Sequence, residues 1–100
     1  METILIVDEN KDMQFTLANI LKEEGYETIT ALDGERAIKE VKARAPNLVL
    51  LDIRLPGMDG MRILKEMKKI DKDLIVIMLT AYGDVKGAVE AMRLGALDYI

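Results

Sequence analysis

The sequence contains no cysteine, no histidine and no tryptophan, and only two of its 100 residues are proline. Without cysteine, the chain forms neither disulfides nor thiolate metal sites. Without histidine, any metal site has to be built from oxygen ligands, which favour a hard cation such as Mg²⁺. A magnesium site is therefore the metal site that this composition permits most readily.

A strong charge and a long hydrophobic run are also missing. The net charge of −4 gives no reason to expect nucleic-acid binding. The first residues, METILIVDENKD, become acidic too early for a signal peptide, and no apolar run approaches the length of a transmembrane helix. Since 50% of the residues are hydrophobic and 32% are charged, the composition is that of a globular domain. We expect one cytoplasmic domain that contacts neither nucleic acid nor membrane.

Short apolar runs alternate with apolar residues at helical spacing. The runs predict strands at 3–7, 27–31, 48–51, 74–79 and 97–100. The helical stripes are Met13–Leu17–Ile20–Leu21, Ala37–Ile38–Val41–Ala45, Ile63–Leu64–Met67–Ile70 and Val85–Ala88–Val89–Met92. A regular alternation of strand and helix predicts an α/β domain, with a parallel sheet covered by helices on both faces.

Residues that typically begin and end helices flank these stripes. Asp33, Asp59 and Asp84 precede three of them and are expected N-caps. Gly25 and Gly95 follow the first and the last, where a helix C-cap commonly needs a left-handed backbone. The predicted helices therefore have defined ends.

Polar residues follow three of the predicted strands. The first strand ends on Asp8 and Glu9, the third on Asp52, and the fourth on Thr80. Each alone is more often a cap or a turn residue, but the carboxyl ends of parallel strands meet at one edge, where such sheets bind ligands. Three carboxylates gathered there would repel one another unless a cation such as Mg²⁺ intervened. Asp52, on the central strand, is then a candidate nucleophile for aspartyl-phosphate chemistry.

Four segments together resemble the receiver domains of bacterial two-component response regulators: ILIVDE (4–9), LVLLDIRLPGMDG (48–60), LTAYGD (79–84) and GALDYI (95–100). The resemblance runs along the whole chain and implies a flavodoxin-like, doubly wound parallel sheet of strand order 2-1-3-4-5. The segments TAYGDV and EAMRLGALDY most closely resemble those in receivers of enhancer-binding transcription activators.

The resemblance also implies roles for the strand-end residues. Asp52 would accept a phosphoryl group from a phosphohistidine of a sensor kinase or phosphotransfer protein. Mg²⁺ would be bound by Asp8, Glu9, Asp52 and the backbone carbonyl of Arg54. Such a domain is a signalling module rather than an enzyme, because it promotes only its own phosphorylation and dephosphorylation.

Three further residues carry expectations about signalling. Thr80 and Tyr99 match the family's switch hydroxyl and switch aromatic. Phe15 is the only phenylalanine and lies roughly opposite the Met13 stripe on a helical wheel, where it could anchor a kinase. The resemblance is compatible with an output domain after this segment, acting in transcription regulation, and with a homodimer.

Two features depart from the family's pattern. The acidic pair is usually two aspartates, whereas the second acid here is Glu9, and Mg²⁺ tolerates little distortion of its coordination. The family's lysine comes shortly beyond the position of Ile100, and its last helix follows that lysine. We therefore expect residues 1–100 to form a C-terminally truncated receiver domain, with the fifth strand cut short and the last helix absent.

Other classes of protein use related sites. A Mg²⁺-dependent phosphohydrolase typically needs a second aspartate two positions after the nucleophile, where Arg54 stands. A flavin- or nucleotide-binding domain would want a glycine-rich or hydroxyl-bearing loop after the first strand, but DENKD is acidic. A receiver-like interaction module that no longer takes phosphate stays open as a third reading.

Overall fold

The computed structural model describes residues 2–52, 54–55, 58–79, 89 and 91–99. The strands are β1 Thr3–Val7, β2 Glu27–Ala31, β3 Leu48–Asp52, β4 Arg54–Leu55, β5 Met58–Asp59, β6 Ile75–Leu79 and β7 Asp98–Tyr99. The helices are α1 Lys11–Glu23, α2 Gly34–Arg44 and α3 Gly60–Ile70. Residues 89 and 91–93 are also helical.

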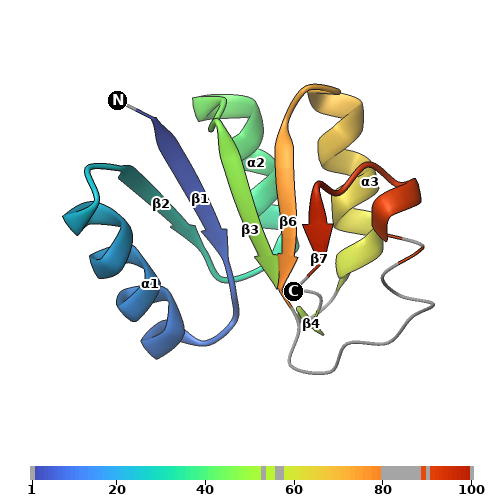
Figure 1. Cartoon of the computed structure of the whole chain (residues 1–100). Helices are drawn as coiled ribbons and strands as arrows, with labels where there is room; N and C mark the ends of the chain where they lie inside the picture. Colours follow the sequence, from blue (N-terminus) through green and yellow to red (C-terminus); the bar gives the residue numbers. More distant parts are fainter. Residues whose placement is uncertain (1, 53, 56–57, 80–88, 90, 100) are drawn as a thin grey trace.

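Five strands form one parallel sheet in the order β2-β1-β3-β6-β7 (Figure 1). Helix α1 lies on one face of this sheet, and α2 and α3 cover the other (Figure 1). The expected strand order 2-1-3-4-5 is therefore confirmed, with the two-residue β7 as its fifth strand. In the described part of the chain, no helix is long and apolar enough to cross a membrane.

The larger core lies between the sheet and the two helices α2 and α3. The stripe expected for α3 is confirmed by Ile63, Leu64 and Met67, which are fully buried, although Ile70 at the helix end is exposed. These side chains pack against strands whose own residues are buried, such as Leu5 and Val49. Burial of this apolar surface is the main stabilising term of the domain.

The prediction for the buried face of α1 is partly wrong. Met13 and Ile20 were expected inside, but they are 47% and 52% exposed. The residues of α1 that contact the sheet are Gln14, Leu17, Ala18 and Leu21. The small Ala18 lets the helix approach Ile4 and Ile6 of β1 closely, so the helix is rotated and half of its apolar stripe faces outward.

The prediction for the buried face of the last helical stripe, Val85–Ala88–Val89–Met92, is also partly wrong. Val89 and Met92 are exposed, and Ala91 is the residue that packs into the core. Val85, Ala88 and the expected N-cap Asp84 lie outside the described residues.

Most expected helix ends are confirmed. Asp33 accepts a hydrogen bond from the Arg36 N–H (2.8 Å), and Asp59 accepts one from the Met61 N–H (3.0 Å). Gly25 and Gly95 have positive φ angles of 93° and 104°, as C-cap glycines require. Strands β4 and β5, which were not predicted, pair antiparallel.

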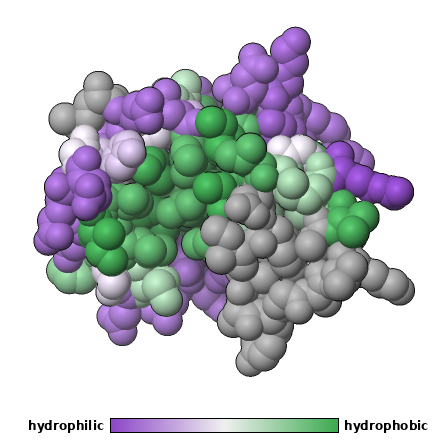
Figure 2. All heavy atoms as spheres, in the orientation of Figure 1, coloured by the Kyte–Doolittle hydropathy of each residue, from purple (hydrophilic) through white to green (hydrophobic). Residues whose placement is uncertain are grey.

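One face of the sheet is covered only in part. Figure 2 shows hydrophobic side chains gathered across the middle of the face that carries α1. Leu48 and Leu50 of β3 are half-buried there beside α1. Ile75, near the start of β6, pairs in register with Leu48 and is 41% exposed. This face therefore offers apolar surface that the described helices leave uncovered.

Candidate functional site

The carboxyl ends of β1, β3 and β6 meet at one edge of the sheet (Figure 1). Asp52 is the last residue of β3 and pairs in register with Leu79 of β6. Val7, the last residue of β1, pairs with Leu51 of β3. The residues that follow this pair are Asp8 and Asp52, so they lie beside each other. Neighbouring strands are about 4.8 Å apart. Two half-buried carboxylates are thus brought together from residues 44 positions apart in the sequence, 8 and 52.

The turn after β1 holds Asp8 in place. Its Oδ1 accepts a hydrogen bond from the Asn10 N–H (2.9 Å), and its own N–H donates to the Ala31 carbonyl (3.1 Å). Asn10 in turn caps α1, because its Oδ1 accepts from the N–H groups of Asp12 (2.9 Å) and Met13 (3.1 Å). The first acidic residue and the start of the helix are therefore fixed by one continuous set of hydrogen bonds.

Gln14 supports this turn and was missed by the sequence reasoning. It is only 6% exposed, and its Nε2 donates to the carbonyls of Asp8 (2.9 Å) and Ala31 (2.6 Å). It therefore ties the ends of β1 and β2 to α1. A signal was present, since Gln14 lies three, four and seven residues before Leu17, Ala18 and Leu21, in the row that faces the sheet.

The remaining candidate residues differ in how they relate to this edge. Glu9 follows Asp8 and is exposed. The backbone of Arg54 follows β3 closely, in β4, and Tyr99 pairs with Met78 of β6 through β7. Thr80 lies outside the described residues, directly after β6. Phe15 is 69% exposed on α1, as the helical wheel predicted.

The donor set of this edge fits a magnesium ion. Its described side chains are carboxylates, the oxygen donors that Mg²⁺ prefers. Two of them come from adjacent strand ends, so one cation could contact both. No set of three or more acidic, His or Cys side chains arranged to hold a metal ion is found within the described ranges.

Comparisons with known proteins agree with this architecture. A family model described as the response regulator receiver domain matches residues 4–100. The chain is 45% identical over 98 residues to sporulation initiation phosphotransferase F of Bacillus subtilis, covering 98% of this chain and 79% of that protein. It is 41% identical to the nitrogen assimilation regulatory protein NtrX of Azorhizobium caulinodans, covering 97% of this chain but only 22% of NtrX.

Solved structures give the same result. A CheY-like receiver domain protein from Methanospirillum hungatei superposes with a TM-score of 0.96 at 32% identity, over 100% of this chain and 80% of that one. NtrX from Brucella abortus superposes with a TM-score of 0.91 at 44% identity, over 100% of this chain and 23% of that one. The flavodoxin-like fold is thereby confirmed. The chain belongs to the family of response regulator receiver domains, the phosphoacceptor signalling modules of two-component systems.

Proposed function

We propose that Asp52 is the phosphoacceptor and that Asp8, Glu9, Asp52 and the backbone carbonyl of Arg54 hold Mg²⁺. The observation that carries the proposal is the meeting of Asp52 and Asp8 at adjacent strand ends. Asp52 is the better placed nucleophile of the two, because it ends β3, the central strand of the sheet.

The reaction transfers one phosphoryl group. A carboxylate oxygen of Asp52 bonds to phosphorus, the phosphorus–nitrogen bond of a phosphohistidine breaks, and the imidazole nitrogen leaves with the bonding electrons. Mg²⁺, when bound, supplies positive charge that offsets the carboxylates and the phosphoryl oxygens. The fixed strand ends contribute positioning, and Asn10 and Gln14 maintain the turn that carries Asp8.

This proposal describes a signalling domain that promotes only its own phosphorylation and dephosphorylation. Its donor would be a sensor histidine kinase or a phosphotransfer protein, and its setting the cytoplasm. The chain spans about a fifth of relatives such as NtrX and AtoC. An output domain that acts in transcription, of the kind that such relatives' names suggest, belongs to the same proposal.

The test is mass spectrometry after incubation with acetyl phosphate and Mg²⁺. We expect one added phosphoryl group on Asp52, no labelling of Asp52→Ala or Asp52→Asn, and strong loss of labelling in excess chelator. Asp33→Ala is a matched control, since Asp33 caps α2 and should leave labelling unchanged. Labelling of the Asp52 variants, or equal labelling in chelator, would reject the assignment. A folded wild-type chain that takes no phosphoryl group would favour the interaction-module reading.

Docking of the kinase is proposed to use Phe15 near the start of α1. An exposed aromatic ring is a common anchor at protein interfaces, and this one lies close in sequence to the acidic pair. We expect Phe15→Ala to slow phosphotransfer from the cognate kinase while acetyl phosphate labelling is maintained. Ile20→Ala, at a similarly exposed apolar position of α1, is the control. Equal phosphotransfer to wild type and Phe15→Ala would refute the docking role.

A further inference from the structure

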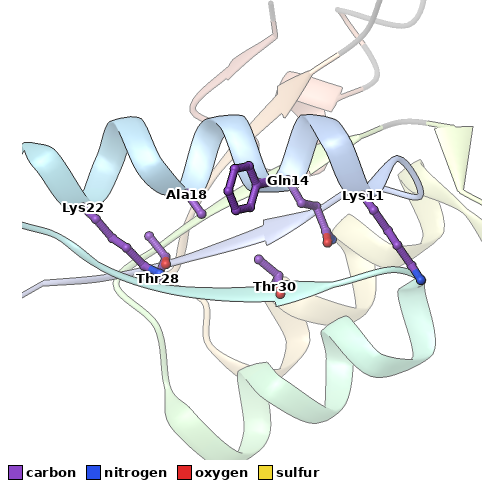
Figure 3. Close-up of a pocket in the computed structure, with 7 residues that line it drawn as sticks. Lys11, Gln14, Ala18, Lys22, Thr28 and Thr30 are labelled. Atoms are coloured by element: carbon purple, nitrogen blue, oxygen red, sulfur yellow. The ribbon is translucent and has the colours of Figure 1, made fainter.

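A groove runs between α1 and β2, the outermost strand of the sheet. It has a volume of about 310 Å³, and its lining includes Gln14 and Ala18 of α1 and Thr28 and Thr30 of β2. Figure 3 shows these side chains between the helix and the strand. None of the proposed phosphoacceptor or Mg²⁺-binding residues lines this groove.

The strand that borders the groove is an edge strand. In the described sheet β2 pairs only with β1, so its outer side presents backbone N–H and C=O groups that no other described strand pairs with. Such an edge can accept a further extended segment through backbone hydrogen bonds. The threonines at alternate positions of β2 are good strand formers and leave room beside the helix.

Positive charge lies at both ends of the groove. Figure 3 shows Lys11 near one end and Lys22 beside Thr28 near the other. The ion pairs found among the described residues, Arg44–Glu40 and Lys69–Glu66, involve neither lysine. The two ammonium groups are therefore available to pair with carboxylates of a bound segment.

Between the lysines lies an exposed aromatic side chain. Phe15 lines the same groove and is 69% exposed. An exposed aromatic ring that can be covered by an apolar partner residue is a typical binding anchor. Along α1 the groove thus presents a positive charge at Lys11, an apolar ring at Phe15 and a second positive charge at Lys22.

We propose that this groove binds an extended acidic segment of a partner protein, which adds to the edge of β2. Lys11 and Lys22 are 11 residues apart, or about 16 Å along a helix. Side chains on one face of an extended strand recur at every second residue, so acids at positions i and i+4 are about 13 Å apart. Flexible lysine stems can cover the difference. An apolar residue at i+2 would lie against Phe15, which gives the pattern acid–x–apolar–x–acid.

The test uses a fluorescein-labelled peptide of sequence Thr-Asp-Thr-Leu-Thr-Asp-Thr and the whole chain. We expect saturable binding that weakens as salt increases, with amide NMR shifts concentrated on α1 and β2. A peptide of the same composition, Thr-Thr-Asp-Leu-Asp-Thr-Thr, puts the leucine on the opposite face from the acids and should bind at least several-fold more weakly. Lys22→Glu and Lys11→Glu should each weaken binding about tenfold, and Phe15→Ala several-fold.

Lys42→Glu is the matched control, since Lys42 is an exposed lysine on α2, across the sheet from α1. Equal loss in Lys42→Glu and Lys22→Glu, equal binding of the two peptides, or no shifts on β2 would overturn the proposal. Inorganic phosphate that gives the same shifts and displaces the peptide would also overturn it, in favour of a simple anion site. Acetyl phosphate labelling of Lys22→Glu should match wild type, so failure of the groove and failure of the Asp52 assignment are distinguishable.

Discussion

A single buried amide joins the fold to the candidate site. Gln14 donates from one nitrogen to two carbonyl oxygens, those of Asp8 and Ala31, at the ends of neighbouring strands. Buried carbonyls that lose such a donor keep the cost of their desolvation. We therefore expect Gln14 to be a positioning residue, which would affect the proposed Asp52 chemistry only through the turn that carries Asp8.

The variant Gln14→Leu tests this role. We expect it to lower the free energy of unfolding by about 1–3 kcal/mol, because the carbonyls of Asp8 and Ala31 each lose a hydrogen bond, although that of Ala31 keeps the one from the Asp8 N–H. Acetyl phosphate labelling should also become slower, because Asp8 is less well held. Thr16→Ala, at an exposed position of the same helix, is the control for both measurements. Labelling at the wild-type rate in a destabilised Gln14→Leu would limit the residue to a structural role.

Gly25 and Gly95 both have positive φ angles. Comparing alanine substitutions at these two positions distinguishes the cost of backbone strain from the cost of a packing clash. A Cβ on Gly95 would lie 2.9 Å from the Cε of Lys68, whereas a Cβ on Gly25 would meet nothing within 4 Å. Both substitutions to alanine impose a left-handed backbone on an L residue, which costs about 1–2 kcal/mol. We expect Gly95→Ala to be more destabilising than Gly25→Ala in denaturant unfolding. Equal costs would mean that the Lys68 stem moves aside without penalty.

The switch pair gives a prediction about signal transmission. A hydroxyl that bonds the phosphoryl group would vacate space for the aromatic ring, so Thr80→Ala should still be labelled while the NMR environment of Tyr99 changes little. In the wild type, labelling should shift Tyr99 resonances clearly. Tyr26, in the connection between α1 and β2, is an internal reference that should not respond. A full Tyr99 shift in labelled Thr80→Ala would contradict the coupling.

At the scale of elements, the sequence predicts strands better than it predicts helix faces. The first four predicted strands, observed as β1, β2, β3 and β6, are confirmed to within a residue at each end. Apolar runs bounded by polar turns define the limits of a strand closely. The face of α1 was misjudged because Gln14 is polar yet buried, while Met13 and Ile20 are apolar yet exposed. Periodicity reports which face is apolar, and only the packing reports which face meets the sheet.

Part of the candidate site was predictable from the order of the elements, and part was not. Asp8 and Asp52 were predicted to meet because parallel strands end at one edge, and their placement depends only on topology and register. The spacing of Gln14 from Leu17, Ala18 and Leu21 indicates its inward position, but its role depends on hydrogen bonds to backbone carbonyls, which spacing does not reveal. The α1–β2 groove also depends on how the helix is rotated over the edge strand.

Helix α3 is expected to contribute more to stability than its length suggests. Met67 is fully buried, while Ile70 one turn later is exposed. We expect Met67→Ala to lower the free energy of unfolding by about 2–5 kcal/mol, because it removes buried atoms and leaves a cavity. Ile70→Ala should cost much less. Comparable losses for the two variants would show that the outer end of α3 packs more tightly than its exposure indicates.

Among the described residues, one face of the sheet is well covered by helices and the other is poorly covered. Helices α2 and α3 bury one side, whereas α1 covers only the β1 and β2 part of the other (Figure 1). The outward half of the α1 stripe and the exposed side chain of Ile75, near the start of β6, add to this second face. Contiguous exposed apolar surface of this kind favours association in water.

We expect this 100-residue chain to self-associate through that face. A twofold dimer would cover the same patch on both copies, and the exposed apolar side chains that form it carry no charge to repel a second copy. Sedimentation should show a concentration-dependent dimer that the double variant Ile20→Ser, Ile75→Thr weakens, since both side chains are exposed and apolar. A Lys42→Ser, Lys72→Ser control changes exposed residues that do not belong to this patch and should leave the dimer intact. Because the variant removes apolar surface from the interface and little from the core, its unfolding midpoint at high dilution should match that of wild type. A monomer at every concentration, or a dimer unaffected by the double variant, would show that this face does not drive association.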